Sequence, residues 1–305
     1  MAPAADPVTF WRRLVAPGSV GGRGPCHQAL SPSSLLPRDD DASAIDVTGP
    51  TAVTTPASPA PKIAARGVRK VYETRRASVT AIEGLDLEAR RGEFVSIVGP
   101  SGCGKSTLLH MLAGFVAPTA GEVTVDGARV LGPDPARGIV FQEFALFGWK
   151  TVLGNVAYGL AEQGVGRRER AERAAHWVRL VGLEGFERHY PKELSGGMKQ
   201  RVALARALVV DPDVLLMDEP FGAVDAQTRV GLQQELLEIW ERTRKTVLFV
   251  THSVDEALAL SDRVCVLSQR PARLREVVEV DLPRPRDLGM PGYAELHRRI
   301  WALLR

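Results

Sequence analysis

One short stretch, Gly99 to Ser106, limits the fold of this chain more than any other feature. It reads Gly-Pro-Ser-Gly-Cys-Gly-Lys-Ser and follows the pattern G-x-x-x-x-G-K-[ST]. An apolar, β-rich run, Phe94 to Val98, leads into it, and a helical run, Thr107 to Ala113, follows it. Glycines let such a loop wrap around phosphate groups with its N–H groups pointing inward. The sequence therefore predicts a strand, a phosphate-binding loop and a helix, with these nucleotide-binding residues: Gly99, Pro100, Ser101, Gly102, Cys103, Gly104, Lys105, Ser106 and Thr107.

Two carboxylates complete the chemistry that this loop implies. The apolar run Val214 to Met217 ends in Asp218 and Glu219. We expect Lys105 to reach the β- and γ-phosphates and the Ser106 hydroxyl to bind Mg²⁺. Asp218 suits the Mg²⁺ shell, and Glu219 lies where a carboxylate polarises the attacking water. An acidic turn after a core strand is the plainer reading of the carboxylates alone, but together the two motifs predict ATP and Mg²⁺ as ligands.

A third segment, Leu194 to Arg201, reads Leu-Ser-Gly-Gly-Met-Lys-Gln-Arg and precedes a helix predicted at 202–210. On its own, a Ser-Gly-Gly start is an ordinary helix N-cap. Beside the other two motifs, the segment closely resembles the signature of the ATP-binding cassette (ABC) ATPases. The resemblance implies that Ser195, Gly196 and Gly197 face the γ-phosphate of ATP held by a partner subunit. Unpaired N–H groups and the helix dipole favour an anion at such a place.

The resemblance covers residues 63–286 and assigns further roles. It implies that Tyr72 stacks on adenine, although a strand aromatic needs no such role. It places Gln142 at Mg²⁺ and the γ-phosphate, and Asp225 at the interface of a dimer. His252 is expected to contact the γ-phosphate and hold the catalytic carboxylate, whereas a lone histidine after a strand is usually structural. The predicted catalytic residues are thus Lys105, Gln142, Glu219 and His252, and the predicted Mg²⁺ ligands are Ser106, Gln142 and Asp218.

Strands that alternate with helices predict an α/β fold, here the P-loop NTPase core of an ABC ATPase. The resemblance adds an antiparallel β subdomain and a helical insert near residues 145–210. Strands are expected at 68–71, 85–88, 93–98, 122–126, 137–142, 214–217 and 246–250, and helices at 106–113, 166–182, 202–210 and 228–242.

Three regions are predicted along the chain. Residues 1–62 hold ten of its 21 prolines and no hydrophobic period. Such a segment buries too little apolar surface to offset its ordering entropy, so we predict a disordered extension. Residues 63–286 are assigned to the ABC ATPase domain, and residues 287–305 to a C-terminal helical tail.

Composition narrows the classes of partner. Lys and Arg number 39 against 36 Asp and Glu, and a net charge of +3 does not indicate a nucleic-acid binder. Three scattered cysteines argue against a disulfide framework and fit a reducing compartment. No run reaches the roughly 18 to 20 apolar residues of a membrane span. The resemblance then implies a homodimer that sandwiches ATP, bound to integral membrane permease subunits at the cytoplasmic face of the cell membrane. It also implies an indirect partner, an extracytoplasmic solute-binding protein.

Segments between the motifs resemble the nitrate, sulfonate and taurine importer branch of the family. They lie at 141–149, 151–156, 251–257, 266–271 and 280–286. The chain departs from that branch at Gly148, Lys150 and Gly154, where Pro, Leu and Asp are usual. These departures lie in the region that docks the membrane subunit, so they concern the permease partner and the solute rather than the ATPase. The alternative is the ATPase subunit of an exporter or another non-importer ABC complex.

Other classes fit less well. DNA-repair and chromosome ABC ATPases carry a long coiled coil between loop and signature, and this chain shows no heptad run between Lys105 and Leu194. Translation-factor ABC proteins hold two cassettes, whereas one phosphate-binding loop is found here. A binding module that does not hydrolyse ATP would have no use for Glu219 and His252.

Two loop features carry predictions of their own. Phe144, Leu146, Phe147 and Trp149 cluster after Gln142, and such a short loop cannot easily bury them all, so some are expected to form an exposed partner site. The alternative is core packing of the helical insert. Inside the phosphate-binding loop, the N–H groups and nearby Lys105 predict a reactive thiolate at Cys103 that ATP protects from alkylation.

Overall fold

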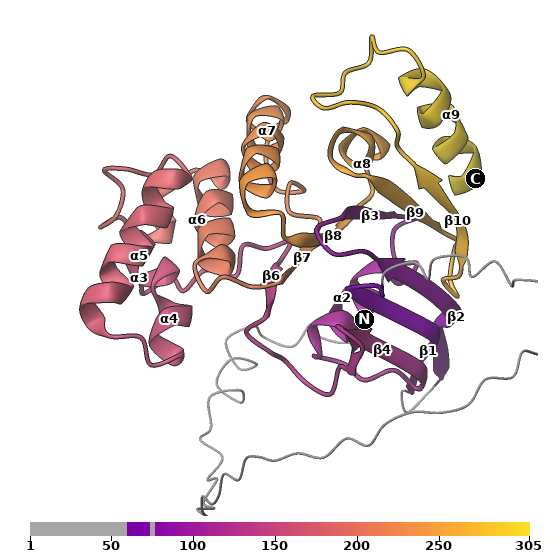
Figure 1. The fold of residues 1–305 in the computed structure, drawn as a ribbon, viewed down its shortest axis with the longest axis horizontal. Coiled ribbons are helices and arrows are strands. Elements are labelled where there is room, and N and C mark those ends of the chain that lie inside the picture. Colours follow the sequence, from indigo (N-terminus) through magenta and orange to yellow (C-terminus); the bar gives the residue numbers. More distant parts are fainter. Residues whose placement is uncertain (1–59, 74–76) are drawn as a thin grey trace, which may run out of the picture. The chain divides into compact units, whose positions relative to one another are not determined.

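The computed structural model describes residues 60–73 and 77–305 (Figure 1). The disorder predicted for residues 1–62 therefore falls almost entirely outside the described residues. Lys62, the last residue of that range, is described, and its side chain is buried.

A six-stranded sheet in the order β10-β9-β3-β8-β7-β6 lies at the centre of the described residues. Its strands from β9 to β6 run parallel, and β10 joins β9 antiparallel at one edge. The bounds are β3 Phe94–Val98, β6 Arg137–Val140, β7 Val214–Asp218, β8 Thr246–Thr251, β9 Arg263–Leu267 and β10 Leu274–Glu279. Every residue of β3, β7 and β8 is buried, as expected for strands covered on both faces.

A second sheet is antiparallel, with four strands in the order β2-β1-β4-β5, and forms the predicted β subdomain. Its strands are β1 Ile63–Glu73, β2 Ser78–Ala89, β4 Ala120–Val125 and β5 Ala128–Arg129. β1 and β2 are much longer than the strands predicted at 68–71 and 85–88. Their pairing continues across register shifts, one of them beside Gly67 at φ 54°. Because these irregularities break the alternation of apolar residues, periodicity shows only part of each strand.

The helices are α2 Lys105–Ala113, α3 Val152–Val156, α4 Tyr158–Glu162, α5 Arg167–Leu180, α6 Gly196–Leu208, α7 Ala226–Thr243, α8 Val254–Leu260 and α9 Tyr293–Leu304, with a 3₁₀ turn at Pro191–Glu193. Helices α3 to α6 occupy the predicted helical insert and lie together in Figure 1. The helix predicted at 202–210 begins earlier, at Gly196, because Ser195 caps it; α7 likewise begins at Ala226, after Asp225. In the described ranges, each helix is too short or too polar to cross a bilayer.

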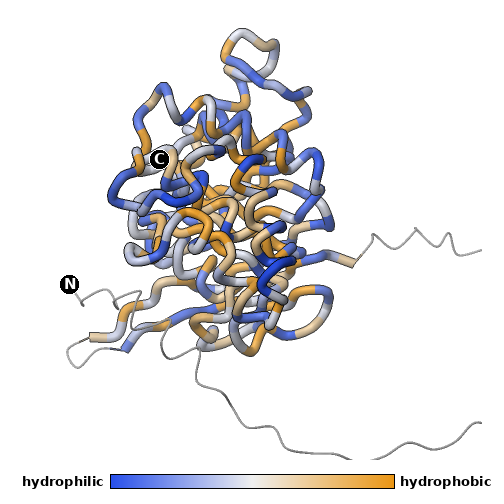
Figure 2. Tube along the Cα trace, turned by 90° about the vertical axis from the view of Figure 1, so that its left-hand side faces the viewer, coloured by the Kyte–Doolittle hydropathy of each residue, from blue (hydrophilic) through white to orange (hydrophobic). Residues whose placement is uncertain are grey.

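The two faces of the central sheet contact different layers. In β8, Val247 and Phe249 join the apolar cluster of α5, α6 and α7, while Leu248 and Val250 join the cluster of α2 and the antiparallel sheet. This alternation is the two-residue period of a strand. Figure 2 shows the hydrophobic segments gathered inside the described residues. The sheet is therefore fixed from both sides, and its strand ends can hold functional loops rigidly.

Candidate functional site

The strand order explains why distant motifs meet. Neighbouring strands β3, β8, β7 and β6 are parallel, so their carboxyl ends share one edge of the sheet. The phosphate-binding loop follows β3, His252 follows β8, and Asp218 and Glu219 close β7. Gln142 follows β6 by two residues, outside the strand predicted at 137–142, because β6 ends at Val140.

The phosphate-binding loop is tightly folded. Gly102 and Gly104 have φ values of 71° and 129°, which disfavour other residues. A Cβ atom on Gly104 would lie 3.0 Å from the Ala81 carbonyl oxygen, so glycine also meets a steric limit there. The buried Lys105 ammonium donates to the carbonyl oxygens of Gly99 and Pro100, at 2.9 and 3.2 Å. The lysine is thereby held beside the loop.

Ser106 and Asp218 converge as the sequence predicts. Ser106 Oγ donates to Asp218 Oδ1 at 3.0 Å. Burial raises the pKa of the Asp218 carboxyl, and nearby Glu219 adds to this. The hydrogen bond from Ser106 and the charges of His110 and Lys105 oppose it. A hydroxyl and one carboxylate are oxygen ligands of the kind Mg²⁺ takes together with substrate phosphates. Within the described residues there is no group of three or more His, Cys, Asp or Glu that could hold a metal without such help.

Glu219 lies between His252 and Lys105. Its Oε2 is 2.9 Å from His252 Nδ1, and its Oε1 is 3.8 Å from Lys105 Nζ. Its φ is 42°, a conformation that non-glycine residues seldom adopt. The Glu219 N–H donates to the Val250 carbonyl at 2.9 Å, which fixes this backbone against β8. Strained backbone of this kind often occurs where a side chain must be aimed.

Gln142 and Tyr72 lie at the margins of the site. Gln142 is exposed, and its Nε2 would lie 3.8 Å from a Cβ on Gly222, so it borders the segment after Glu219. Within the described residues, no hydrogen bond joins Gln142 to Ser106 or Asp218, the other two predicted Mg²⁺ ligands. Tyr72 Oη lies 3.5 Å from Thr107 Oγ1, so its ring borders the start of α2.

The signature residues form a helix N-terminus. Ser195 Oγ accepts a bond from the Met198 N–H at 3.3 Å and caps α6. A Cβ on Gly197 would lie only 2.6 Å from Thr228 Cγ2, so glycine allows α6 and α7 to approach closely. Asp225 caps α7 through a bond from the Thr228 N–H at 3.0 Å. The sequence located this segment but did not show that Gly197 is required by packing.

One chain does not bring the signature to its own phosphate-binding loop. Among the described residues, no hydrogen bond or ion pair joins 195–197 to 99–107. Figure 1 shows strands β6 and β7 between α6 and α2. Asp225 likewise contacts its own helix and not the loop. The predicted nucleotide residues therefore fall into two groups within this chain.

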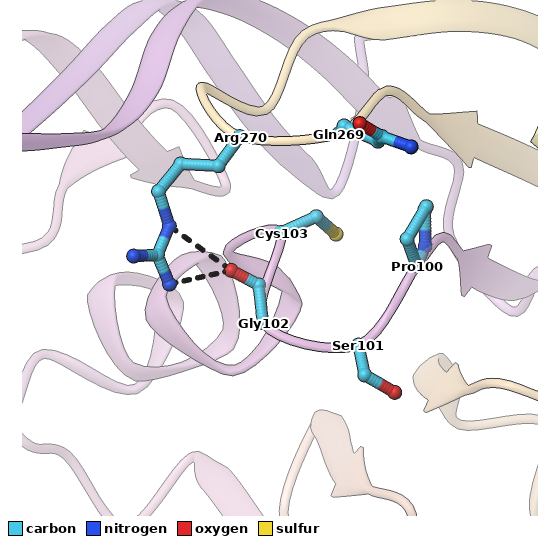
Figure 3. A pocket seen from close by; sticks show the side chains of 6 residues that line it. All are labelled: Pro100, Ser101, Gly102, Cys103, Gln269 and Arg270. Atoms are coloured by element: carbon cyan, nitrogen blue, oxygen red, sulfur yellow. Dashed lines mark hydrogen bonds between the residues drawn. The ribbon is translucent and has the colours of Figure 1, made fainter.

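Sequence reasoning missed Arg270, and its prediction for Cys103 loses its basis. Arg270 Nε and Nη2 lie 3.1 and 2.7 Å from the Gly102 carbonyl oxygen, in a pocket that Figure 3 shows. Cys103 is 1% exposed, packed among apolar residues. The inward direction of loop N–H groups says nothing about that side chain, so we no longer expect alkylation of the folded chain.

Comparison with known proteins gives the family. Residues 82–222 match the family model described as ABC transporter. An uncharacterized ABC transporter ATP-binding protein of Methanocaldococcus jannaschii is 51% identical over 244 residues, covering 80% of this chain and 91% of that protein. The taurine import ATP-binding protein TauB of Burkholderia pseudomallei is 51% identical over 230 residues, covering 75% of this chain and 88% of that protein. The aliphatic sulfonates import ATP-binding protein SsuB of Bacillus cereus is 44% identical over 234 residues, covering 77% of this chain and 92% of that protein.

A solved structure supports the same assignment. A dimeric, post-hydrolysis ATP-binding cassette bound to ADP and Pi matches with a TM-score of 0.64 and 33% identity, covering 72% of this chain and 100% of that one. This chain belongs to the ABC transporter family. It has the ABC ATPase fold predicted from its motifs, and it is the ATP-binding, ATP-hydrolysing type of subunit.

Proposed function

We propose that this chain energises the import of a small solute such as taurine, another sulfonate or nitrate, through a separate membrane permease. Its likeness to TauB and SsuB over three quarters of its length supports the importer reading. In this proposal the chain binds at the cytoplasmic face of the membrane, and an extracytoplasmic solute-binding protein delivers the solute.

The observation that carries the catalytic part is the contact of Glu219 with both His252 and Lys105. Glu219 holds and polarises the attacking water, and His252 fixes the direction of its carboxylate. Lys105 offsets charge that develops on the phosphates. Ser106 and Asp218, with Gln142, would hold Mg²⁺, which when bound offsets further phosphate charge. Tyr72 borders the place for the adenine ring.

We further propose that two copies complete each ATP site. Ser195 is exposed at the N-terminus of α6 but lies apart from the chain's own loop. A second copy can place this helix end against the γ-phosphate, where its N–H groups favour an anion. The dimeric state of the matched cassette of known structure supports such an association.

The composite site can be tested by mixing two inactive chains. Lys105→Ala disables the loop, and Ser195→Arg disables the signature. Dimers of either variant have no intact site, but a mixed dimer has one. Co-expressed chains with different tags, purified through both, should regain ATPase activity. Activity no higher than in either separate variant would exclude sites shared between chains.

The import proposal is tested in cells that lack only this chain. We expect loss of radiolabelled taurine or alkanesulfonate uptake, restored by the wild-type chain but not by Glu219→Gln. Sulfate uptake serves as the control. Unchanged uptake of sulfonates, taurine and nitrate, together with impaired efflux of some compound, would favour the exporter alternative.

A further inference from the structure

An arginine outside the nucleotide motifs contacts the phosphate-binding loop from its outer side. Arg270 lies in the turn between β9 and β10, and two of its nitrogens donate to the Gly102 carbonyl oxygen, at 3.1 and 2.7 Å. Figure 3 shows this oxygen directed at the guanidinium. The two residues are 168 positions apart in sequence. The turn therefore reaches the middle of the loop through one side chain.

The turn that carries Arg270 is itself firmly held. Ser268 Oγ accepts from the Arg273 N–H at 3.0 Å and donates to the Pro271 carbonyl at 3.1 Å. Ala272 is fully buried, and its N–H donates to the Ala81 carbonyl of β2 at 2.9 Å. The turn is thus braced against the antiparallel sheet. Because the backbone that carries Arg270 is held in place, the guanidinium can hold the Gly102 carbonyl in place as well.

The residues that join the turn to the antiparallel sheet also confine Gly104, near the end of the loop. A Cβ on Gly104 would lie 3.0 Å from the Ala81 carbonyl oxygen and 3.4 Å from Ala272 Cβ. Gly104 is therefore confined by packing, whereas Gly102 is confined by the two bonds from Arg270. Between them, the peptide carbonyl of Gly102 is engaged outside the loop. The N–H of the same peptide, that of Cys103, donates to the Pro100 carbonyl at 3.2 Å inside the loop. This peptide is therefore fixed at both ends, which holds the loop in a shape whose other N–H groups are available to phosphate.

We propose that Arg270 is a positioning residue for nucleotide binding, which holds the peptide between Gly102 and Cys103 and so keeps the loop in the conformation that binds phosphate. The inference rests on the proposed nucleotide role of the loop. Without the clamp, the loop samples orientations that do not bind phosphate. The apparent affinity for ATP then falls by the fraction of chains in the competent state. The rate of the bound complex depends on other groups, so kcat is affected little.

Steady-state kinetics of the full chain test the clamp. Arg270→Met removes both donors, and we expect KM for ATP to rise about 3- to 10-fold with kcat within about twofold. Arg270→Lys keeps one charged donor, so its KM for ATP should lie between those of Arg270→Met and the wild type. Arg273→Met is the matched control, because its exposed side chain makes no hydrogen bond or ion pair within the described residues. Melting temperatures should agree among all four proteins.

Hydrogen exchange without nucleotide gives a second readout. Amides at 101–104 should exchange faster in Arg270→Met, while those of β9 and β10 stay unchanged. A KM equal to that of Arg273→Met, a loss confined to kcat, or unchanged exchange at 101–104 would each overturn the clamp. Lys105→Ala separates the two proposals: if that variant binds ATP normally, the loop itself is not the nucleotide site. If Lys105→Ala fails to bind while Arg270→Met binds like wild type, only the clamp is wrong.

Discussion

The single residue on which hydrolysis depends most is Glu219. Its carboxylate contacts His252 at 2.9 Å and lies 3.8 Å from the Lys105 ammonium, on a backbone with positive φ. The amide in Glu219→Gln keeps the size and one accepting oxygen, but it is uncharged and a very weak base. The loop keeps its residues, and Lys105 still donates to the carbonyls of Gly99 and Pro100. The variant therefore separates ATP binding from turnover.

We predict that Glu219→Gln binds ATP normally and loses about 100-fold or more in turnover. The ATP-bound dimer should accumulate, which sizing chromatography with ATP and Mg²⁺ would detect. Glu238→Gln, an exposed carboxylate on α7, is the control and should behave as wild type. Near-normal turnover in Glu219→Gln would show that Glu219 is not the catalytic carboxylate.

Lys62 shows how one residue can join distant segments. Its side chain is 1% exposed, and Nζ bonds Asp126 and lies 3.0 Å from Asp213 Oδ2. Lys62→Met keeps the apolar stem and leaves two half-exposed carboxylates in water. We therefore expect the free energy of unfolding to fall by about 1–3 kcal/mol at neutral pH, measured with urea. Arg168→Ala, which breaks an exposed pair with Glu172, should change it by less than about 0.5 kcal/mol.

The Lys62 pair also predicts a pH dependence. The hydrogen bond from Lys62 lowers the pKa of Asp213, with burial opposing and the charges of Lys62, Lys245 and Arg91 adding to it. A folded-state pKa below the unfolded value gives stability that is present above about pH 4 and lost as pH falls through the folded pKa. Wild type should therefore lose more stability than Lys62→Met on acidification below about pH 4. A difference in unfolding free energy between wild type and Lys62→Met that stays constant as the pH falls would contradict this.

At the scale of elements, the sequence predicts local features well and long-range ones poorly. The phosphate-binding loop, the strand ending in Asp218 and the signature each have a signal within a few neighbouring residues. Apolar periodicity placed the start of α6 too late, at 202, because a Ser-Gly-Gly cap carries no apolar period, although the segment itself was interpreted as a helix cap. Arg270 was missed because its partner is 168 positions away. Contacts of this kind appear only once the sheet order brings strand ends together.

The close approach of α6 and α7 predicts that Gly197→Ala lowers the unfolding free energy when Thr228 is present, but not when Thr228 is replaced by serine. In Gly197→Ala the new Cβ would lie 2.6 Å from Thr228 Cγ2, and this β-branched residue cannot easily turn away. Overpacking costs about 1–3 kcal/mol, while alanine favours a helix over glycine by about 0.5–1 kcal/mol. We therefore expect a net loss of unfolding free energy of about 1–2 kcal/mol.

Adding Thr228→Ser deletes the clashing methyl group. The double variant should be at least as stable as Thr228→Ser alone, because only the gain in helix propensity remains. Thermal or urea unfolding of the four proteins gives the coupling between the two positions. Additive effects would show that the two helices do not meet at this contact.

At the scale of the whole molecule, α6 connects the signature to the loop that follows Gln142. Near the other end of α6, Arg206 donates to the carbonyls of Ala145 and Phe144, at 2.7 and 3.0 Å. Burial lowers the pKa of Arg206 to about 10, so it stays charged at neutral pH and needs these acceptors. Movement of α6 on ATP binding would therefore be passed to residues 144–149.

The same loop divides its apolar residues between core and surface. Phe147 is buried, with its ring 4.6 Å from that of Tyr158, and Leu146 packs against the core. Trp149 remains 62% exposed. Core packing thus accounts for Phe147 but not for Trp149. We infer that Trp149 is the part of the predicted partner site that contacts the permease.

We predict that Trp149→Ala keeps the melting temperature and basal ATPase of the isolated chain. Binding to membranes that contain its permease should weaken by about 2 kcal/mol or more, since exposed aromatic anchors carry much interface energy. Co-sedimentation and permease-stimulated ATPase measure this. Leu131→Ala, another exposed apolar residue at 88%, lies outside the loop and is the control. If Trp149→Ala instead melts several degrees lower and binds the membranes normally, Trp149 supports the fold, and the coupling surface lies elsewhere.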